Sequence, residues 1–468
     1  MNLESPSNNE SFRDSIATID AKGKRSWIYP KKPFGRLHNK RIVVSIVLLT
    51  LLFTGPFMKL NGHPFLLFNV IQRKFILFGI PFWPQDFFLF VLAMLTFFVF
   101  IILFTVVFGR VWCGWACPQT IFMEMVFRKI EYWIEGDASE QKLLNKAPWG
   151  KIKISKKASK HFIFFAISFL IANTFLAYII GIDQLKLLAT EGPTTHSSGF
   201  IALVVFTGLF YGVYARFREQ VCLVVCPYGR LQGVLLDKNS IVIAYDYSRG
   251  EPRGKFNKKE TRSLGDCIDC HQCVSVCPTG IDIRYGTQLE CVNCTACIDA
   301  CDHMMDNVGL DRGLIRYTSE NSIAYKTPFK ITARIYGYAA VLVVLFSTLV
   351  IFLSLRSDVD STLLRTPGQI FQTVDSTHLS NLYNIQLVNK TFDDMPINLV
   401  LNNPEGKIKF VGNAITRIPK DSMVEGVFFV VLPVNVIHGL KTPLDISILS
   451  GNKVVSKIKS NFIGPGMY

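Results

Sequence analysis

The sequence predicts a multi-domain membrane protein. We expect an α-helical membrane domain of about five transmembrane helices, an inserted ferredoxin-like domain and a C-terminal all-β immunoglobulin-like sandwich. Half of the 468 residues are apolar and 18% are charged, whereas soluble proteins carry about 25% charged residues. Eight of the twelve cysteines lie in two quartets between residues 267 and 301. After residue 355, short segments of alternating polarity are separated by turn residues.

Five apolar segments approach or exceed the ~20 residues that a helix needs to cross a bilayer. They are residues 42–60, 86–108, 161–182, 198–217 and 335–355. The first follows 41 polar and basic residues, which is too late for an ordinary cleaved signal peptide. We therefore interpret it as an uncleaved anchor.

The distribution of Lys and Arg predicts the orientation of these segments. Residues 1–41, 109–160 and 216–334 carry 9, 10 and 16 of them, whereas residues 61–85 and 183–197 carry 2 and 1. The N-terminus is therefore expected in the cytoplasm and the C-terminus outside. Because 35 of the 50 basic residues fall in expected cytoplasmic parts, the net charge of +15 is explained by this bias and by attraction to anionic membrane lipid. No nucleic-acid partner is expected, since no folded basic module or recognition motif is visible.

Two details of the membrane domain bear on packing. The outside loop 61–85 is apolar but interrupted by Pro64, Pro81 and Pro84, which favours an interfacial or re-entrant segment over a span. Gly208 and Gly212 form a GxxxG spacing, which lets two helices approach closely. Packing within one chain is favoured over a dimer contact.

The two quartets each have the spacing C-x2-C-x2-C-x3-C. That spacing is typical of [4Fe–4S] ferredoxins, in which the fourth cysteine of one quartet ligates the other cluster. The sequence therefore predicts a dicluster domain with crossed ligation. The first cluster is assigned to Cys267, Cys270, Cys273 and Cys301, and the second to Cys291, Cys294, Cys297 and Cys277.

Zinc and disulfides explain the quartets less well. Zinc sites usually pair two CxxC units across a longer loop, and disulfides do not suit the reducing cytoplasmic side. Pro278 follows the first quartet, whereas Asp302 follows the second without removing a ligand. We expect His271 and His303 to be solvated or hydrogen-bonded, because each cluster already has four thiolates.

The other four cysteines form an internal repeat. Cys113, Cys117 and Pro118 follow the second apolar segment, and Cys222, Cys226 and Pro227 follow the fourth, each as a CxxxCP motif. The spacing of four predicts two sulfurs on one face of a helical turn. Four soft sulfurs suit copper(I), zinc or an iron–sulfur cluster, and close thiols suit redox exchange. Buried structural cysteines are the alternative, but the repetition favours metal or redox chemistry.

Beyond the fifth segment, residues 384–390, 407–411, 427–432 and 445–449 are predicted strands, with turns at 402–406 and 450–452. About 113 residues of this kind suit an immunoglobulin-like sandwich. His378, His438, Met395, Met423 and Met467 could supply copper ligands there, although docking to a partner is the favoured use of this domain. The expected domains are residues 1–41, 42–235, 236–334, 335–355 and 356–468.

These residues together resemble the CcoG, FixG or RdxA family of cytochrome oxidase accessory proteins. The resemblance rests on the stretches 73–79 and 83–86, the two CxxxCP motifs and the crossed quartets ending in Cys-Ile-Asp-Ala-Cys-Asp302. It implies a dimeric bacterial inner-membrane electron carrier with two [4Fe–4S] clusters, held by the eight quartet cysteines. It also implies reduction of Cu(II) to Cu(I) for assembly of cbb3-type cytochrome oxidase, with Cys113, Cys117, Cys222 and Cys226 as copper or thiol-redox candidates. The oxidase or its copper-delivery factors would be partners, and the electron donor is unknown.

Two other functions stay open at this point. A quinol-linked membrane polyferredoxin would feed electrons to another reductase and can carry CxxxCP motifs too. A non-enzymatic redox-sensing scaffold would use the clusters to report oxygen. No nucleotide or flavin fingerprint is visible, so any such cofactor is expected on a partner.

Overall fold

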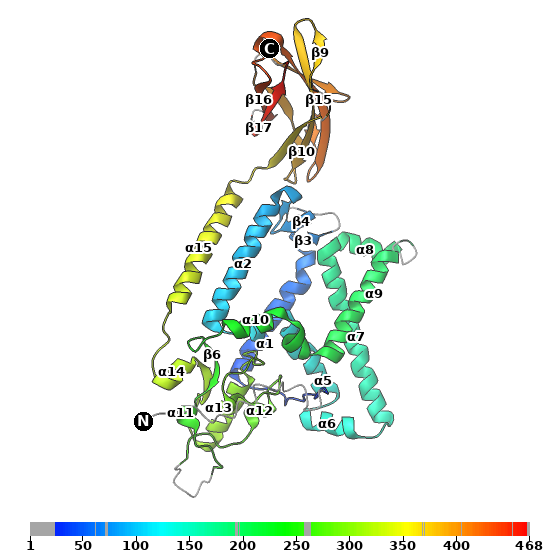
Figure 1. Ribbon diagram of the computed structural model, residues 1–468. Coiled ribbons are helices and arrows are strands. Elements are labelled where there is room, and N and C mark those ends of the chain that lie inside the picture. The colour runs from blue at the N-terminus through cyan, green and yellow to red at the C-terminus, as the bar shows by residue number, and fades with distance from the viewer. Residues whose placement is uncertain are drawn as a thin grey trace. The chain divides into compact units, whose positions relative to one another are not determined.

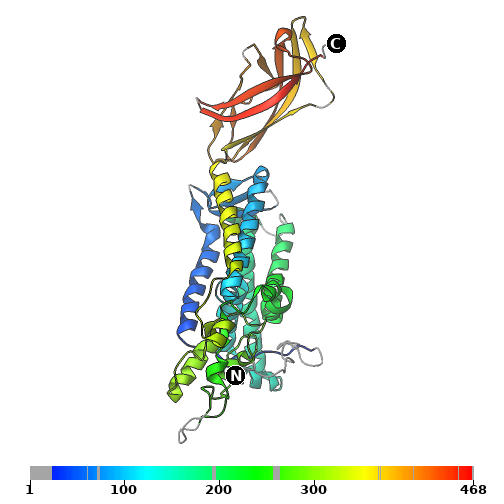
Figure 2. The ribbon, with the colours of Figure 1, turned by 60° about the vertical axis from the view of Figure 1, so that its left-hand side comes forward.

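The computed structural model describes residues 24–465 except 61, 71–73, 192–194, 196, 257–263, 367, 369, 404 and 452. Arg73 and Met467, and the turn residues Pro404 and Asn452, therefore lie outside the described residues. The chain forms two compact units, Met1–Phe57 with Met94–Leu345 and Met58–Ala93 with Phe346–Tyr468. Figures 1 and 2 show the elements of both.

The five predicted apolar helices are confirmed as helices long and apolar enough to cross a membrane. They are Arg36–Phe57 (α1 and a 3-10 turn), Pro84–Phe108 (a 3-10 turn and α2), Lys151–Ile180 (α7), Ser197–Phe217 (α9 and a π-helical turn) and Ala333–Ser354 (α15). The first ends three residues earlier than expected, after Gly55 and Pro56. Helices α7 and α9 pack against each other.

Helix α7 starts ten residues before the expected span because its basic first turns have partners. Lys153 Nζ donates to the carbonyl oxygens of Asn145 (2.9 Å) and Ala147 (2.6 Å). Lys160 lies 2.9 Å from a carboxylate oxygen of Glu135. Buried lysines are tolerated only when paired, so these contacts extend the helix beyond its apolar part.

Shorter elements connect the spans in the first unit. They are α3 (Val111–Trp115), α4 (Pro118–Ile121), η4 (Phe122–Phe127, π-helical), α5 (Arg128–Ile134), α6 (Ala138–Lys146), α8 (Ile182–Glu191), η6 (Val221–Val225, π-helical) and α10 (Pro227–Leu235). A Cβ on Gly208 or Gly212 would meet no atom within 4 Å. The expected packing of this GxxxG pair within the chain is therefore not seen among the described residues.

The cysteine-rich domain is built on one antiparallel strand pair, β6 (Val242–Tyr245) with β7 (Ile315–Thr318). Between these strands lie α11 (Tyr247–Gly250), α12 (Gln272–Ser275), η7 (Ile283–Tyr285) and α13 (Ala296–Val308), and α14 (Glu320–Tyr325) follows. An N-terminal strap, residues 24–34, lies against this domain, with Lys31 N donating to Ser275 O at 2.8 Å. The strap also contacts α5, since Tyr132 Oη donates to Pro30 O at 3.1 Å.

The loop between the first two apolar helices, which the Lys and Arg distribution places outside, folds into strands rather than a helix. After a short β1–β2 hairpin (Lys59–Leu60, His63–Pro64), β3 (Leu66–Asn69), β4 (Lys74–Leu77) and β5 (Ile80–Phe82) form an antiparallel meander. The prolines that argued against a span are also compatible with edge strands.

The C-terminal sandwich has two sheets. The first has the strand order β13-β15-β10-β8, and β9 also pairs with β10; the second has the order β12-β16-β17. The strands are β8 (Val359–Arg365), β9 (Gln372–Asp375), β10 (His378–Asn389), β12 (Asn398–Leu401), β13 (Lys407–Val411), β15 (Met423–Pro433), β16 (Lys441–Ser450) and β17 (Lys453–Ile463), and Met395–Pro396 (β11) pairs with Arg417–Ile418 (β14). Three of the four predicted strands lie within these, and the first, 384–390, extends one residue past the end of β10. Fully buried side chains from both sheets, such as Tyr383, Phe428 and Phe462, form one core.

Candidate functional site

The eight quartet cysteines surround the interior of the β6–β7 domain. A cavity with about 340 Å³ free of atoms is lined by Cys273, Cys277, Cys291, Cys294 and Cys297, among apolar residues such as Ile281. Cys277, from the first quartet, thus lies with three cysteines of the second. Similarly, the charges of Cys273, Cys270 and Cys267 act on the Cys301 thiol. The same cavity also holds Cys273, which the spacing assigns to the other cluster. The structure therefore gathers cysteines of both quartets in one interior, and the crossed division into two sets stays a prediction.

The two quartet loops have matching backbone conformations. Asp269 and His271 of the first loop and Asn293 and Thr295 of the second have positive φ angles between 53° and 68°. Non-glycine residues adopt this conformation uncommonly. Each lies between two cysteines of a CxxC step, so the left-handed residues turn both loops inward in the same way.

The chemistry of these donors fits iron–sulfur clusters. Burial raises the pKa of Cys273 and Cys291 to about 12 and that of Cys294 to about 11. The free thiols would therefore be protonated at neutral pH, and cluster insertion would release protons. Among the described residues, no three His, Cys, Asp or Glu side chains are grouped to hold a single metal ion, so the preference for clusters over zinc rests on the cysteine spacing.

Exposure distinguishes one thiol rather than one set. Cys270 is exposed, whereas the other three cysteines of its set, Cys267, Cys273 and Cys301, are buried. In the second set Cys294 and Cys297 are buried and Cys277 and Cys291 are half-buried. Next to Cys270, His271 Nδ1 accepts a hydrogen bond from an Nη of Arg284 at 2.9 Å, and Arg284 also pairs with Asp269. His303 bonds Asn307 at 3.3 Å. Both histidines thus have hydrogen-bond partners.

Each CxxxCP motif spans a break between two helices. Cys113 lies in α3, but Cys117 has an extended ψ of 124° and precedes Pro118, which opens α4. Cys226 is likewise extended (ψ 113°) before Pro227, which opens α10. Proline disfavours helix in the residue before it and fits the first helical position. The second cysteine of each pair still closes the preceding helical turn, because Cys117 N donates to Trp112 O at 2.9 Å and Cys226 N donates to Val221 O at 2.8 Å. That the two sulfurs of each pair share one face stays a prediction.

The first motif packs directly on the second quartet. Cys113 shares an apolar cluster with Cys294 and Val292. Gly114 has no side chain, and a Cβ there would lie 2.5 Å from Val292 O. Trp115 Nε1 donates to Tyr317 Oη at 3.1 Å, and Tyr317 Oη donates to Asn293 O at 3.2 Å.

Two residues near Cys113 were not identified from sequence. Gln232 of α10 is fully buried, and its Oε1 accepts from Arg110 Nε at 2.6 Å and from Cys113 Sγ at 3.4 Å. Arg110 also donates to Leu289 O. The only sequence indication was an arginine just before each motif, Arg110 and Arg218.

The second motif lines a cavity between the membrane domain and the quartet domain. Cys222, on the π-helical turn η6, borders this cavity with Thr120 and Glu124 on one side and with Thr279 and Val292 on the other. Burial raises the pKa of Cys222 to about 12, and the charges of Cys117, Cys113 and Cys226 add to the shift. The other three CxxxCP thiols therefore lie within electrostatic range of Cys222. All twelve cysteines are free thiols.

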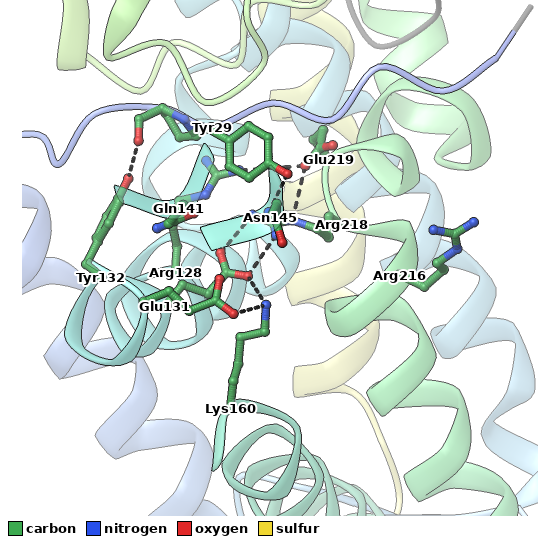
Figure 3. A network of polar contacts seen from close by, with 12 residues as sticks. Tyr29, Arg128, Glu131, Tyr132, Gln141, Asn145, Lys160, Arg216, Arg218 and Glu219 are labelled. Atoms are coloured by element: carbon green, nitrogen blue, oxygen red, sulfur yellow. Dashed lines mark hydrogen bonds and ion pairs between the residues drawn. The ribbon is translucent and has the colours of Figure 1, made fainter. Parts of the chain in front are cut away.

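A buried ion-pair network adjoins this motif (Figure 3). Arg218 forms a bidentate pair with Glu131 (2.8 and 2.9 Å). Arg128, which is 1% exposed, lies 2.6 Å from Glu124 and 3.6 Å from Glu219. Lys160 of α7 lies 3.6 Å from Glu131. The pairs join α5, η4, α7 and the start of the second motif. π-helical turns such as η4 and η6 are frequent at functional sites.

Comparisons with known proteins agree with this site. A 4Fe-4S dicluster domain model matches residues 217–320, a 4Fe-4S binding domain model matches 90–156, and a model for an IG-like fold at the C-terminal of FixG, putative oxidoreductase, matches 349–465. Together with the five apolar helices, they define a membrane-associated electron-transfer protein with two [4Fe–4S] clusters. The immunoglobulin-like fold predicted for the C-terminal domain is confirmed.

The chain belongs to the FixG/RdxA family. It is 35% identical to protein RdxA of Cereibacter sphaeroides, over 82% of this chain and 83% of that protein. It is 34% identical to RdxB of the same organism, over 78% and 80% of the two chains. It is 39% identical to the nitrogen fixation protein FixG of Rhizobium meliloti, over 64% of this chain and 59% of that protein. A crystal structure of a FixG-related protein from Vibrio parahaemolyticus matches 23% of this chain and 97% of that one, with 16% identity and a TM-score of 0.20.

Proposed function

We propose that this protein reduces Cu(II) to Cu(I), one electron per ion, for the assembly of a cbb3-type cytochrome oxidase. The observation that carries this proposal is the packing of Cys113 against Cys294 and Val292. A thiol of the candidate copper-handling motif thereby contacts a loop of the second cluster. When bound, the two [4Fe–4S] clusters would supply one-electron carriers.

The CxxxCP cysteines would bind the copper substrate, and the residues around them would keep these thiols in position. Soft thiolates stabilise Cu(I), and Cys113, Cys117, Cys222 and Cys226 are gathered at the helix ends. Gln232 and Arg110 fix the position of Cys113. Because these thiols are not grouped around a single ion, copper binding is expected to draw them closer together.

The exposed Cys270 supports electron entry at the first set of cysteines. A soluble donor can approach this thiol, which is the only one of the eight quartet cysteines that is exposed. We place the N-terminus and the cluster domain (residues 236–334) in the cytoplasm and the sandwich (356–468) in the periplasm, from the distribution of Lys and Arg. The sandwich would then dock to the oxidase or its copper-delivery factors, and the chain would act as a homodimer.

The test uses purified, dithionite-reduced protein freed of excess reductant under anaerobic conditions. Cu(II) is added, and the cluster and Cu(II) signals are followed by electron paramagnetic resonance. The preparation should hold about eight irons per chain, as two [4Fe–4S] clusters require. We then expect the cluster signal and the Cu(II) signal to fall in equal stoichiometry. Reduced clusters that persist beside unreduced Cu(II) would refute the proposal.

A variant separates copper binding from cluster chemistry. Cys222→Ser removes one thiol from the second motif and leaves all eight quartet cysteines. We expect full iron content with slower copper reduction. Val225→Ala, which changes an exposed side chain of the same turn η6 and removes no thiol, is the matched control.

A further inference from the structure

The start of the membrane helix α1 lacks a cap of its own. The first N–H groups of a helix have no partner within it, and Gly35, the residue before α1, has no side chain to supply one. Asp299 fills this role from a distant part of the chain. Its two carboxylate oxygens accept from Leu37 N at 3.1 Å and from His38 N at 2.7 Å. A carboxylate also complements the positive end of a helix.

Asp299 belongs to the cluster-binding helix. It lies on α13 between Cys297, assigned to the second cluster, and Cys301, assigned to the first, and is 8% exposed. The contact is close, because a Cβ on Gly35 would collide with the Asp299 carboxylate. Any shift of α1 must therefore move α13, or break two charge-assisted hydrogen bonds.

The same end of α1 also holds the first CxxxCP motif. Arg41 is 2% exposed, and its Nε donates to the carbonyl oxygen of Gly114 at 2.6 Å. Residues 37, 38 and 41 share one helix face, and α1 packs on both α13 and α3. Arg41 therefore binds the carbonyl oxygen of Gly114, the residue whose backbone packs against Val292.

We infer that Asp299 and Arg41 are positioning residues that pin one end of α1 to both the cluster helix and the first CxxxCP motif, and so keep Cys113 against the loop of Cys294. The inference rests on the proposed electron transfer to copper for its function, but the packing itself can be tested without copper. Neither residue touches the substrate.

The first test is Asp299→Ala in the full-length membrane protein. Asp306→Ala is the matched control, since Asp306 lies on the same helix, is exposed and pairs with Arg312. We expect eight irons per chain in both. Alkylation of Cys113 by N-ethylmaleimide, measured by mass spectrometry, is expected to rise at least about tenfold in D299A, because loss of positioning commonly changes rates by one to two orders of magnitude. Copper reduction should slow by a similar factor, and the control should match the wild type in both readouts.

A second variant keeps the outcome decisive if D299A loses iron. Arg41→Gln leaves α13 unchanged, and Lys40→Gln, at an exposed neighbouring position, is its control. The inference would be overturned if D299A kept its full iron content and Cys113 reacted with N-ethylmaleimide no faster than in the wild type. If D299A lost iron, the same result in R41Q would overturn it. Rescue by Asp299→Asn, which keeps one carbonyl acceptor, would support it. If the wild type failed to reduce copper, the proposed function would fall, while alkylation of Cys113 would still decide the positioning role.

Discussion

The two CxxxCP motifs look alike in sequence but have different surroundings. Cys113 is buried against the second quartet, and its neighbour Arg110 bonds Gln232 and Leu289 O. Cys222 lines a cavity with Thr120, Met123 and Glu124, and its preceding arginine, Arg218, pairs with Glu131. The comparison indicates a division of labour, in which the first motif packs in an apolar cluster with the second quartet and the second motif lines a cavity shared by the membrane domain and the quartet domain.

The largest effect should come from removing Arg218. In Arg218→Ala the carboxylate of Glu131 would keep Lys160 at 3.6 Å but lose its bidentate partner, and breaking a buried ion pair costs about 3–5 kcal/mol. We expect a lower melting temperature in detergent, with part of the loss recovered in the double variant R218A/E131A. Arg216→Ala, at an exposed position two residues earlier, should melt as the wild type does. Equal melting of R218A and R216A would show that the network does not stabilise the second motif.

A smaller effect is expected from glycines that allow close backbone contact. Gly114→Ala would place a Cβ 2.5 Å from Val292 O, and Gly229→Ala one 2.6 Å from Cys222 O. Overpacking of this kind costs about 1–3 kcal/mol. Of these two variants, only G114A should also expose Cys113 to alkylation. Gly114 contacts Val292 of the quartet loop, whereas Gly229 contacts Cys222 of the second motif. Gly208→Ala, with no atom near its Cβ, is the control. Equal exposure of Cys113 in G114A and G229A would contradict the division of labour.

The pH dependence of thiol reactivity sharpens the comparison further. Since the pKa of Cys222 is raised to about 12, its thiolate fraction in copper-free protein should increase about tenfold per pH unit from pH 7 to 10. Alkylation of Cys222 should follow this slope without a plateau. A plateau near pH 9, close to the ordinary thiol pKa, would mean that the cavity is open to solvent.

The smallest effect should come from Tyr317→Phe. The hydroxyl links Trp115 of the first motif to Asn293 O of the quartet loop, and a hydrogen bond of this kind contributes about 1 kcal/mol. We expect a slight loss of stability with full iron content, measured by thermal unfolding and iron analysis. A loss of iron would show that this link supports the cluster loop more strongly than its hydrogen bonds suggest.

The main architecture could be predicted because each part has a local pattern. The length of the apolar segments identifies the five helices, and the spacing of the cysteines identifies the ferredoxin-type domain. The alternation of polar and apolar residues identifies the strands 384–390, 407–411, 427–432 and 445–449. Strand β17 was missed because Lys453, Lys457 and Lys459 obscure its alternation. The meander of residues 66–82 was missed because its prolines argue only against a helix.

The contacts that assemble the site could not be predicted. Asp299 and Leu37 are 262 positions apart, and Arg110 and Gln232 are 122 apart. No local pattern marks residues that meet only after the ferredoxin-type domain docks on the helix ends. The left-handed residues Asp269 and Asn293 are of types that tolerate this conformation, whereas nothing in the sequence distinguishes His271 or Thr295.

The exposure of one quartet cysteine has a consequence for how the two clusters survive in air. Oxidative damage to cysteine sulfur follows solvent access, and Cys270 is the exposed thiol among the eight. The cluster that Cys270 would hold should therefore be destroyed first, and the other should outlast it. Bleaching of the visible spectrum in air should then proceed in two phases of similar amplitude. A briefly aerated cell would keep a half-loaded protein that retains one of its two clusters.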